Sequence, residues 1–186
     1  MGRRPIDPQK IMIAAVEAAN ALGFEAVTLA AVAEKLGVKI PSLYNYFDGL
    51  TGLRRMLTLW ALRELIGQMR LAAVGVAGAE AIRAVGDTYR QFAHTHVGVY
   101  PAVLRAHPDD AEINHVAEGF IHLILTILKP YRFENDAALY HSVRVFRSMM
   151  HGFVDLERQG GFGMPLALDE SFEHLIATYI AGLIHP

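Results

Sequence analysis

The stretch that follows Gly37 brings together side chains that can hold and read a nucleic acid. Lys39, Tyr44 and Tyr46 are long enough to reach backbone phosphates, while Ser42 and Tyr44 are short or flat enough to reach base edges in a major groove. Gly37 suits the end of one helix, and Pro41 is tolerated only in the first turn of the next. This order of residues predicts two short helices joined by a tight turn, the second presenting its polar side outward.

The residues before the turn predict the helix that supports it. Thr28 suits the N-cap position, because its hydroxyl can accept from a free N–H of the first turn. Apolar residues then recur at helical spacing and give one buried face: Leu29, Val32, Ala33 and Leu36. In the second helix Leu43 and Phe47 are four residues apart, so we expect both to face inward.

The nine histidines do not have the spacing of a metal site. His94 and His96 are two residues apart, and on a helix such side chains point roughly 200° apart. His115 and His122 share a face but are two turns apart, too far to bind one ion without further ligands. We expect structural or pocket-lining histidines, with His151 packing against a neighbouring helix.

Catalytic patterns are missing from the sequence. There is no cysteine, which excludes thiolate metal sites, disulfides and cysteine nucleophiles. No HExxH motif, paired-carboxylate motif or recognisable nucleophile and base pair is present. The sequence therefore predicts a protein that is not an enzyme and needs no cofactor.

A set of aromatic, sulfur-containing and polar side chains in the later part of the chain has two interpretations. It is either ordinary core or the lining of an apolar cavity with a few polar groups to orient a ligand. The candidate pocket residues are Trp60, Tyr89, Phe92, His96, Tyr100, Arg105, Phe120, Phe146, Met149 and Met150.

The rest of the chain is helical in pattern, with no convincing period-2 strand. Besides the two short helices, we expect a first helix from Asp7 to Gly23. Six further helices follow, over 50–74, 79–95 and 100–105, one ending at Pro130, one over 135–160 and one capped by Asp169. The predicted domain boundary is the turn at residues 48–52, giving domains 1–49 and 50–186.

The last two predicted helices are too apolar to be buried on one side only. This favours an intersubunit four-helix bundle in a homodimer. The candidate interface residues are Leu139, Val143, Val154, Phe172, Leu175, Ile176, Tyr179, Ile180 and Leu183.

Composition and charge narrow the class of protein. Hydrophobic residues make up 53% of the 186 residues, yet no apolar run approaches the roughly 20 residues that span a bilayer. With no export signal either, we expect a cytoplasmic protein without a membrane partner. The net charge is −2, but residues 1–55 carry +2 and the remainder −4. This asymmetry fits a small basic DNA reader on an acidic body.

The pattern as a whole resembles a known family. Thr28, Ala33, Gly37-Val38, Pro41-Ser42-Leu43-Tyr44 and Phe47 resemble the N-terminal DNA-binding domain of the TetR (tetracycline repressor) family of transcriptional regulators. His151-Gly152-Phe153, Leu156-Glu157, Gly160-Gly161-Phe162 and Asp169-Glu170-Ser171-Phe172 resemble the C-terminal regulatory domain of one TetR subgroup. That subgroup has a Trp-His-Gly signature, and position 150 is Met here.

The resemblance implies which residues contact DNA. The matching positions are Thr28, Lys39, Ile40, Pro41, Ser42, Tyr44, Asn45 and Tyr46. A phosphate-binding Lys of the family is replaced by Leu50, a loss for which Arg54 and Arg55 could compensate. Arg3 and Arg4 could also act as a basic arm.

Residues and resemblance together predict an all-α regulator with an N-terminal three-helix helix-turn-helix domain and a C-terminal six-helix domain for ligand binding and dimerisation. We expect a homodimeric repressor that binds a palindromic operator and is released by a small apolar or aromatic effector. Two alternatives stay open: an enzyme or small-molecule carrier that uses the same helical body, and a partner-binding member that has lost operator binding.

Overall fold

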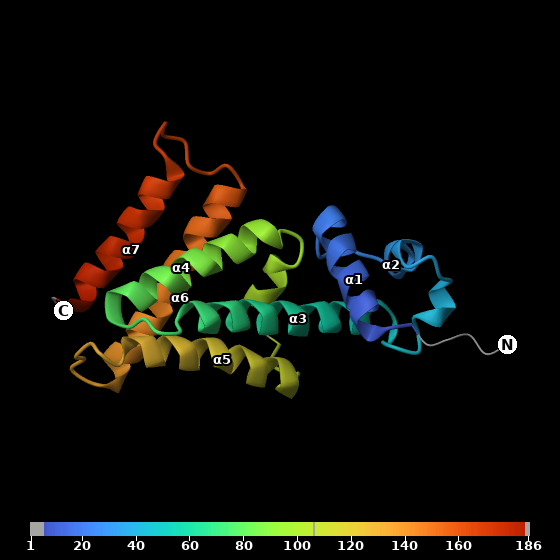
Figure 1. The fold of residues 1–186 in the computed structure, drawn as a ribbon, viewed down its shortest axis with the longest axis horizontal. Helices are drawn as coiled ribbons and strands as arrows, with labels where there is room; N and C mark the ends of the chain where they lie inside the picture. Colours follow the sequence, from blue (N-terminus) through green and yellow to red (C-terminus); the bar gives the residue numbers. More distant parts are fainter. Residues whose placement is uncertain (1–5, 106, 185–186) are drawn as a thin grey trace. The chain divides into compact units, whose positions relative to one another are not determined.

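The computed structural model describes residues 6–105 and 107–184, and in these ranges every regular element is a helix (Figure 1). The elements are α1 (Pro8–Leu22), α2 (Leu29–Lys35), the 3₁₀ helix η1 (Ile40–Ser42), α3 (Gly49–Ala72), α4 (Gly78–Thr95), the 3₁₀ helix η2 (Tyr100–Leu104), α5 (Ala111–Leu128), α6 (Asp136–Arg158) and α7 (Leu168–Ile184). The predicted all-α architecture is confirmed.

The chain forms two compact units, each made of segments that are distant in sequence. The first combines Met1–Glu64 with Thr95–Val116, and the second combines Leu65–His94 with Ala117–Pro186. Helices α3 and α5 therefore contribute one part to each unit. The domains 1–49 and 50–186 stay a prediction.

In the first unit, local capping explains where α1 begins and ends. The Asp7 carboxylate accepts from the Gln9 N–H at 2.9 Å, and Pro8 takes the first helical position. Gly23 ends the helix with a φ of 92°. Ile11, Ala15 and Ala18 form its buried face, whereas Leu22 at the end of the helix is 51% exposed.

The segment that includes η2 packs closely against α1. The Gly98 N–H donates to the Asn20 side chain at 3.0 Å. A Cβ at position 98 would lie 1.9 Å from the Ala19 carbonyl oxygen, so only glycine fits this approach. This contact adds residues from the middle of the sequence to the unit that holds α1 and α2.

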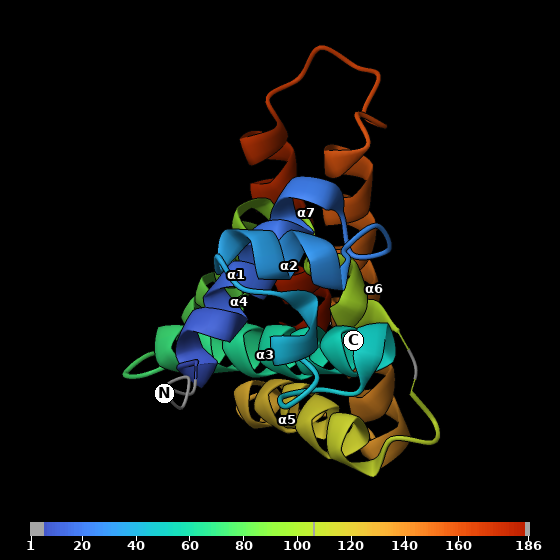
Figure 2. The same cartoon turned by 90° about the vertical axis from the view of Figure 1, so that its right-hand side faces the viewer.

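In the second unit, aromatic rings line the core. The ring of Tyr89 on α4 lies 6.3 Å from that of Phe120 on α5, and Phe146 on α6 follows at 6.5 Å. Tyr179 on α7 is 5.6 Å from Phe146. Helices α6 and α7 lie side by side and are joined by the loop 159–167, as both views show (Figures 1 and 2).

Helix α7 begins two residues earlier than predicted, because a cap at Asp169 would place the first helical residue at 170. Asp169 was expected to be the cap, but the helix starts at Leu168 and Asp169 lies in its first turn. There its carboxylate pairs with Arg90 at 2.8 Å. A tertiary ion pair therefore uses the side chain that the local pattern assigned to capping.

Among the described helices, α5 alone is long and apolar enough to pass a membrane-span test of length and composition. A core helix of a soluble protein passes the same test, so this composition does not indicate a membrane span by itself.

Candidate nucleic-acid interface

Helix α2 and the turn after it form as the sequence predicts. The Thr28 hydroxyl accepts from the Ala31 N–H at 3.2 Å. At the other end Gly37 has a φ of 63°, and its N–H donates to the Glu34 carbonyl at 3.0 Å. The Val38 N–H reaches back to the Ala33 carbonyl at 3.0 Å, which completes a Schellman motif. This geometry fixes the direction in which the chain leaves α2.

The second short helix of the motif is tighter than predicted. Only Ile40–Ser42 forms a regular 3₁₀ helix, in which the Leu43 N–H donates to the Ile40 carbonyl at 2.9 Å. A further turn follows, closed by the Tyr46 N–H on the Leu43 carbonyl at 2.9 Å. A segment this short gains little from helix propagation, so successive i→i+3 turns satisfy its backbone.

Burial divides this segment into an anchoring side and an outward side. Leu43 is fully buried and Phe47 is 8% exposed, as their spacing predicted. Most of the predicted DNA-contacting side chains are exposed, and Ser42 and Tyr46 are half-buried; the exposed ones are Thr28, Lys39, Ile40, Pro41, Tyr44 and Asn45. The fold thus leaves polar and aromatic side chains exposed in the segment after the Gly37 turn.

Tyr46 has a second role that the sequence did not indicate. Its hydroxyl accepts from the Ile6 N–H at 2.7 Å and donates to the Ile6 carbonyl at 3.0 Å. The side chain therefore ties Ile6, which precedes α1, to the end of the segment from Lys39 to Phe47, which we call the reading turn. Arg3 and Arg4, the predicted basic arm, lie outside the described residues.

The two arginines considered as substitutes for the missing lysine are held by acidic groups. Arg54 donates to the Glu25 carbonyl and pairs with its carboxylate at 3.6 Å. Arg55 contacts Asp110 through two hydrogen bonds of 2.6 and 3.1 Å and Glu112 at 2.7 Å. These hydrogen bonds raise the pKa of Arg55 and lower the pKa values of both carboxylates. A phosphate contact by either arginine would require breaking such a pair, and Leu50 is exposed at the position of the family's lysine.

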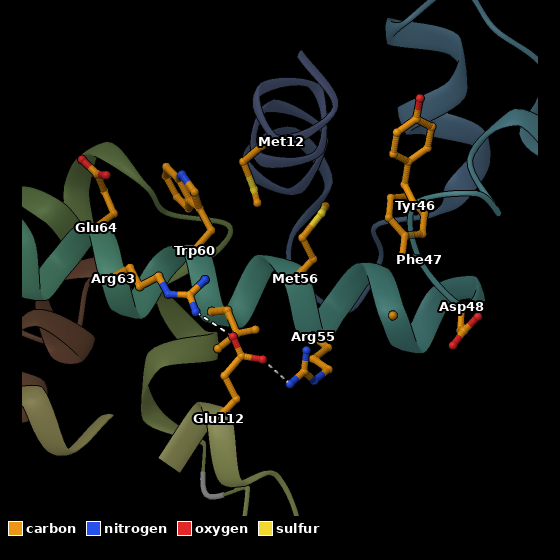
Figure 3. Close-up of a pocket in the computed structure, with 12 residues that line it drawn as sticks. Met12, Tyr46, Phe47, Asp48, Arg55, Met56, Trp60, Arg63, Glu64 and Glu112 are labelled. Atoms are coloured by element: carbon orange, nitrogen blue, oxygen red, sulfur yellow. Dashed lines mark hydrogen bonds and ion pairs between the residues drawn. The ribbon is translucent and has the colours of Figure 1, made fainter. Parts of the chain in front are cut away.

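A groove of about 490 Å³ lies in the first unit beside the end of the reading turn (Figure 3). Its lining comes from α1, the turn before α3, one face of α3 and the start of α5. The residues are Met12, Tyr46, Phe47, Asp48, Gly52, Arg55, Met56, Leu59, Trp60, Arg63, Glu64 and Glu112. Arg63 pairs with Glu112 at 2.7 Å, so Glu112 holds both arginines of the groove.

The structure distributes the predicted pocket residues over both units. Trp60, His96, Tyr100 and Arg105 belong to the first unit, and the other six belong to the second. Trp60 stacks edge-to-face on His96 at 5.1 Å, and burial lowers the pKa of His96. Arg105 pairs with Glu25 and lies over the Phe24 ring, 5.2 Å from its centre. The assignment of these ten residues to one ligand pocket stays a prediction.

The predicted interface residues are mostly buried within a single chain. Val143, Val154, Phe172, Ile176, Tyr179, Ile180 and Leu183 are each less than 9% exposed, and Leu139 and Leu175 are half-buried. The surface between α6 and α7 is instead a groove of about 410 Å³, lined by Ser142, Val145, Met149, Leu175, Thr178, Tyr179, Gly182 and Leu183. An interface on these helices would use this outer surface.

No three His, Asp or Glu side chains gather as a metal site would require anywhere in residues 6–105 and 107–184.

Comparison with known proteins decides the family. A model of bacterial regulatory proteins of the tetR family matches residues 11–55, and a model of the tetracyclin repressor-like C-terminal domain matches residues 82–179, more than half of the chain. The chain belongs to the TetR family. The predicted recognition is therefore confirmed at the level of the family.

Relatives of this TetR-family chain are named as regulators. It is 32% identical over 178 residues to the HTH-type transcriptional regulator YobS of Bacillus subtilis, covering 95% of this chain and 92% of that protein. It is 31% identical over 163 residues to the HTH-type transcriptional regulator Rv0681 of Mycobacterium tuberculosis, covering 87% and 74%. Its fold matches that of the transcriptional regulator FadR from Bacillus subtilis, solved in complex with stearoyl-CoA, with a TM-score of 0.74 at 15% identity, covering 95% and 99%.

Sequence reasoning found the TetR-type reading turn but missed the contacts around it. The hydrogen bonds between Tyr46 and Ile6 join residues that are 40 positions apart in the sequence. Arg55 is 55 positions from Asp110 and 57 positions from Glu112, the two carboxylates that hold it. No local pattern carries such pairings. The one local signal is that Arg55 has no acidic residue three or four positions away, so no ion pair within its own helix was available to it.

Proposed function

We propose that this TetR-family regulator is a homodimeric repressor that binds a palindromic operator and is released from it by a small apolar or aromatic effector. The observation that carries the proposal is the outward surface after Gly37. Lys39, Tyr44 and Asn45 are exposed there, while Leu43 and Phe47 fasten the same segment to the core. A rigidly anchored turn with exposed polar groups is what direct reading of a major groove requires.

Dimerisation follows from the size of the reading element. One 3₁₀ turn offers few contacts, whereas a two-fold dimer places two copies in successive major grooves about 34 Å apart. The groove between α6 and α7 supports this, because Val145 and Tyr140 on α6 are 52% and 53% exposed and Gly182 on α7 leaves open space. A second copy packed on this surface would cover these side chains.

Release by an effector requires that the two conformations bind it differently. A coupling free energy of about 1–3 kcal/mol changes operator affinity roughly 5- to 150-fold, which is enough to switch transcription. The related fold of FadR was solved with stearoyl-CoA, a ligand with a long apolar chain. The aromatic core that includes Tyr89, Phe120 and Phe146 makes an apolar or aromatic effector the best match for this chain. We place the protein in the cytoplasm, where operator DNA is accessible.

The test is selection of bound duplexes from a random DNA library at two salt concentrations, using the full chain. A palindromic motif and a steep fall of affinity with salt are expected. Replacing Lys39 with Ala should weaken binding to all sequences and reduce the salt slope by about one, whereas Tyr44→Ala should relax the selected motif.

Lys129→Ala is the matched control, because Lys129 is an exposed lysine of the second unit. It should leave both motif and salt slope unchanged. Recovery of no motif from folded protein would reject operator binding and favour the alternative of a carrier or partner-binding protein.

A further inference from the structure

The groove beside the reading turn has room for a small molecule. Its volume of about 490 Å³ falls within the range of ligand pockets, and every lining residue belongs to the first unit. Figure 3 shows that α3 forms its floor, with Met12 of α1 on one side and Glu112 of α5 on the other. The groove does not use the aromatic core of the second unit.

One side of the groove is apolar and polarisable. Met12, Met56 and Trp60 lie on the same side of α3 in Figure 3, and Leu59 lines the groove with them. Thioether side chains adapt to ligands of different shape, and an indole face attracts cations. These residues suit a compact apolar body, especially one that carries a positive charge.

The opposite side of the groove presents cations that are already neutralised. Arg55 is held by Asp110 and Glu112, and Arg63 is held by Glu112 at 2.7 Å. An anionic ligand would have to displace these carboxylates from short, charge-assisted hydrogen bonds. The charged groups therefore disfavour an anion even though two arginines line the groove.

The lining as a whole has a negative balance. Two arginines stand against three carboxylates: Asp48, Glu64 and Glu112. Glu64 lies on the same side of α3 as Trp60 (Figure 3). His96, whose ring contacts Trp60, has a pKa lowered by burial despite the opposing effect of Glu64, so burial disfavours a positive charge on this ring.

We propose that this groove binds a lipophilic cation, with its apolar body on Met12, Met56 and Trp60 and its charge directed toward Glu64. The positive charge of the ligand contacts both the indole face of Trp60 and the carboxylate of Glu64. The apolar body of the ligand displaces water from the thioether side chains of Met12 and Met56.

The groove also adjoins the reading turn. Tyr46 and Phe47 are among its lining residues, so an occupant contacts the end of the segment that presents Tyr44. A cation that binds the free and the operator-bound conformations of this segment differently changes operator affinity, and operator then changes cation affinity by the same factor. This coupling, unlike the binding itself, rests on the proposed operator function.

The test uses tetraphenylphosphonium as the probe and tetraphenylborate as its control, two ions of nearly the same shape and opposite charge. Trp60 is the only tryptophan of the chain, so its fluorescence reports on this groove. We expect saturable quenching by the cation, with the anion binding at least about tenfold more weakly. Calorimetry on the same samples provides the affinities independently.

Two variants test the assignment of the site. Glu64→Gln should weaken cation binding about three- to tenfold, whereas Glu34→Gln, at an exposed carboxylate outside the groove, should have no effect. Met12→Phe narrows the groove without changing its charge and should also weaken binding. Equal binding of both ions, or cation binding unaffected by Glu64→Gln and Met12→Phe, would overturn the proposal.

Binding is measured without DNA, so the two proposals fail separately. If no operator is found but the cation binds as expected, the site stands and the operator function falls. If an operator is found but the cation does not bind, the operator function stands and the cation site is rejected.

Discussion

Two tyrosines two residues apart in the reading turn have different surroundings. Tyr44 is 56% exposed, whereas the Tyr46 hydroxyl both accepts from and donates to the backbone of Ile6. Tyr44 is thus available to DNA, and Tyr46 fastens the start of the chain to the turn. Because hydroxyl groups can act in both directions, one side chain satisfies two backbone groups.

Removing only the hydroxyl of Tyr46 tests this attachment. Tyr46→Phe should lower the free energy of unfolding by about 1–2 kcal/mol, because two hydrogen bonds are lost and the ring remains. Urea unfolding measures the change. Tyr44→Phe is the matched control and should stay within about 0.5 kcal/mol of the wild type; an equal effect of both changes would contradict the assigned role.

A charged cluster in the second unit is centred on the carboxylate of Glu157, which contacts Arg90 and His94. Arg90 contacts Glu157 at 2.9 and 2.5 Å and lies over the Phe172 ring, 4.9 Å from its centre. His94 reaches the same carboxylate at 2.9 Å. The Glu157 side chain is only 8% exposed, so its charge depends on these partners.

This cluster predicts a pH dependence of stability. The Arg90 hydrogen bonds lower the pKa of Glu157 below its ordinary value of 4.5. The unfolded chain therefore binds a proton more readily than the folded one, and the stabilisation is present above about pH 4.5 and lost as the pH falls through the lowered value.

Urea unfolding at fixed protein concentration between pH 7 and 3 checks this. Glu157→Gln should cost about 2 kcal/mol at pH 7 and flatten the loss of stability on acidification. Glu134→Gln, at an exposed loop carboxylate, should leave the acid dependence unchanged. An unchanged acid dependence in Glu157→Gln would show that the pair does not carry it.

At the scale of elements, the turn after α2 depends on backbone geometry. Gly37 has a positive φ of 63° and completes the Schellman motif, and no neighbouring atom restricts the space for a side chain. Gly67, within α3, also has open space around it but ordinary helical backbone. Because neither position has a steric conflict, a difference between alanine substitutions at these two glycines measures the strain of the left-handed backbone alone.

Alanine at these positions should have opposite effects. Gly37→Ala should destabilise by about 1–2 kcal/mol because a Cβ disfavours left-handed backbone. Gly67→Ala should stabilise by about 0.5–1 kcal/mol because it reduces the entropy of the unfolded chain. Thermal and urea unfolding measure both, and destabilisation by the α3 substitution would contradict the argument.

At the scale of the whole molecule, the α6 and α7 surface should control assembly. Val145 is exposed in the groove between these helices, so an Asp there disturbs no core packing of the single chain. We expect Val145→Asp to raise the dimer dissociation constant at least about tenfold, because it buries a charge at an apolar interface. Sedimentation equilibrium measures the constant.

Val74→Asp provides the control, because Val74 is 74% exposed but lies in the turn after α3, outside the groove. Helical content should be unchanged in both variants, and binding to a palindromic duplex should fall only for Val145→Asp. A dimer insensitive to Val145→Asp would move the interface elsewhere.

The sequence by itself determined the elements and the inward positions of the reading turn. Thr28, Gly37 and the spacing of Leu43 and Phe47 act through the backbone and through side chains within a few residues, so local patterns sufficed. The length of the second helix of the motif was the exception. A segment so short has too few backbone bonds to choose between α and 3₁₀ geometry from its sequence.

Only the tertiary structure decided which of these residues meet. Most of the predicted pocket and interface residues are apolar, and a helical pattern predicts that they are buried but not which residues they pack against. The fold places Val143 and Ile176 in the core of one chain and leaves Val145 outside. The fold also pairs Arg55 with Asp110 and Glu112. Such pairs depend on how helices distant in sequence pack together, and no local spacing encodes that packing.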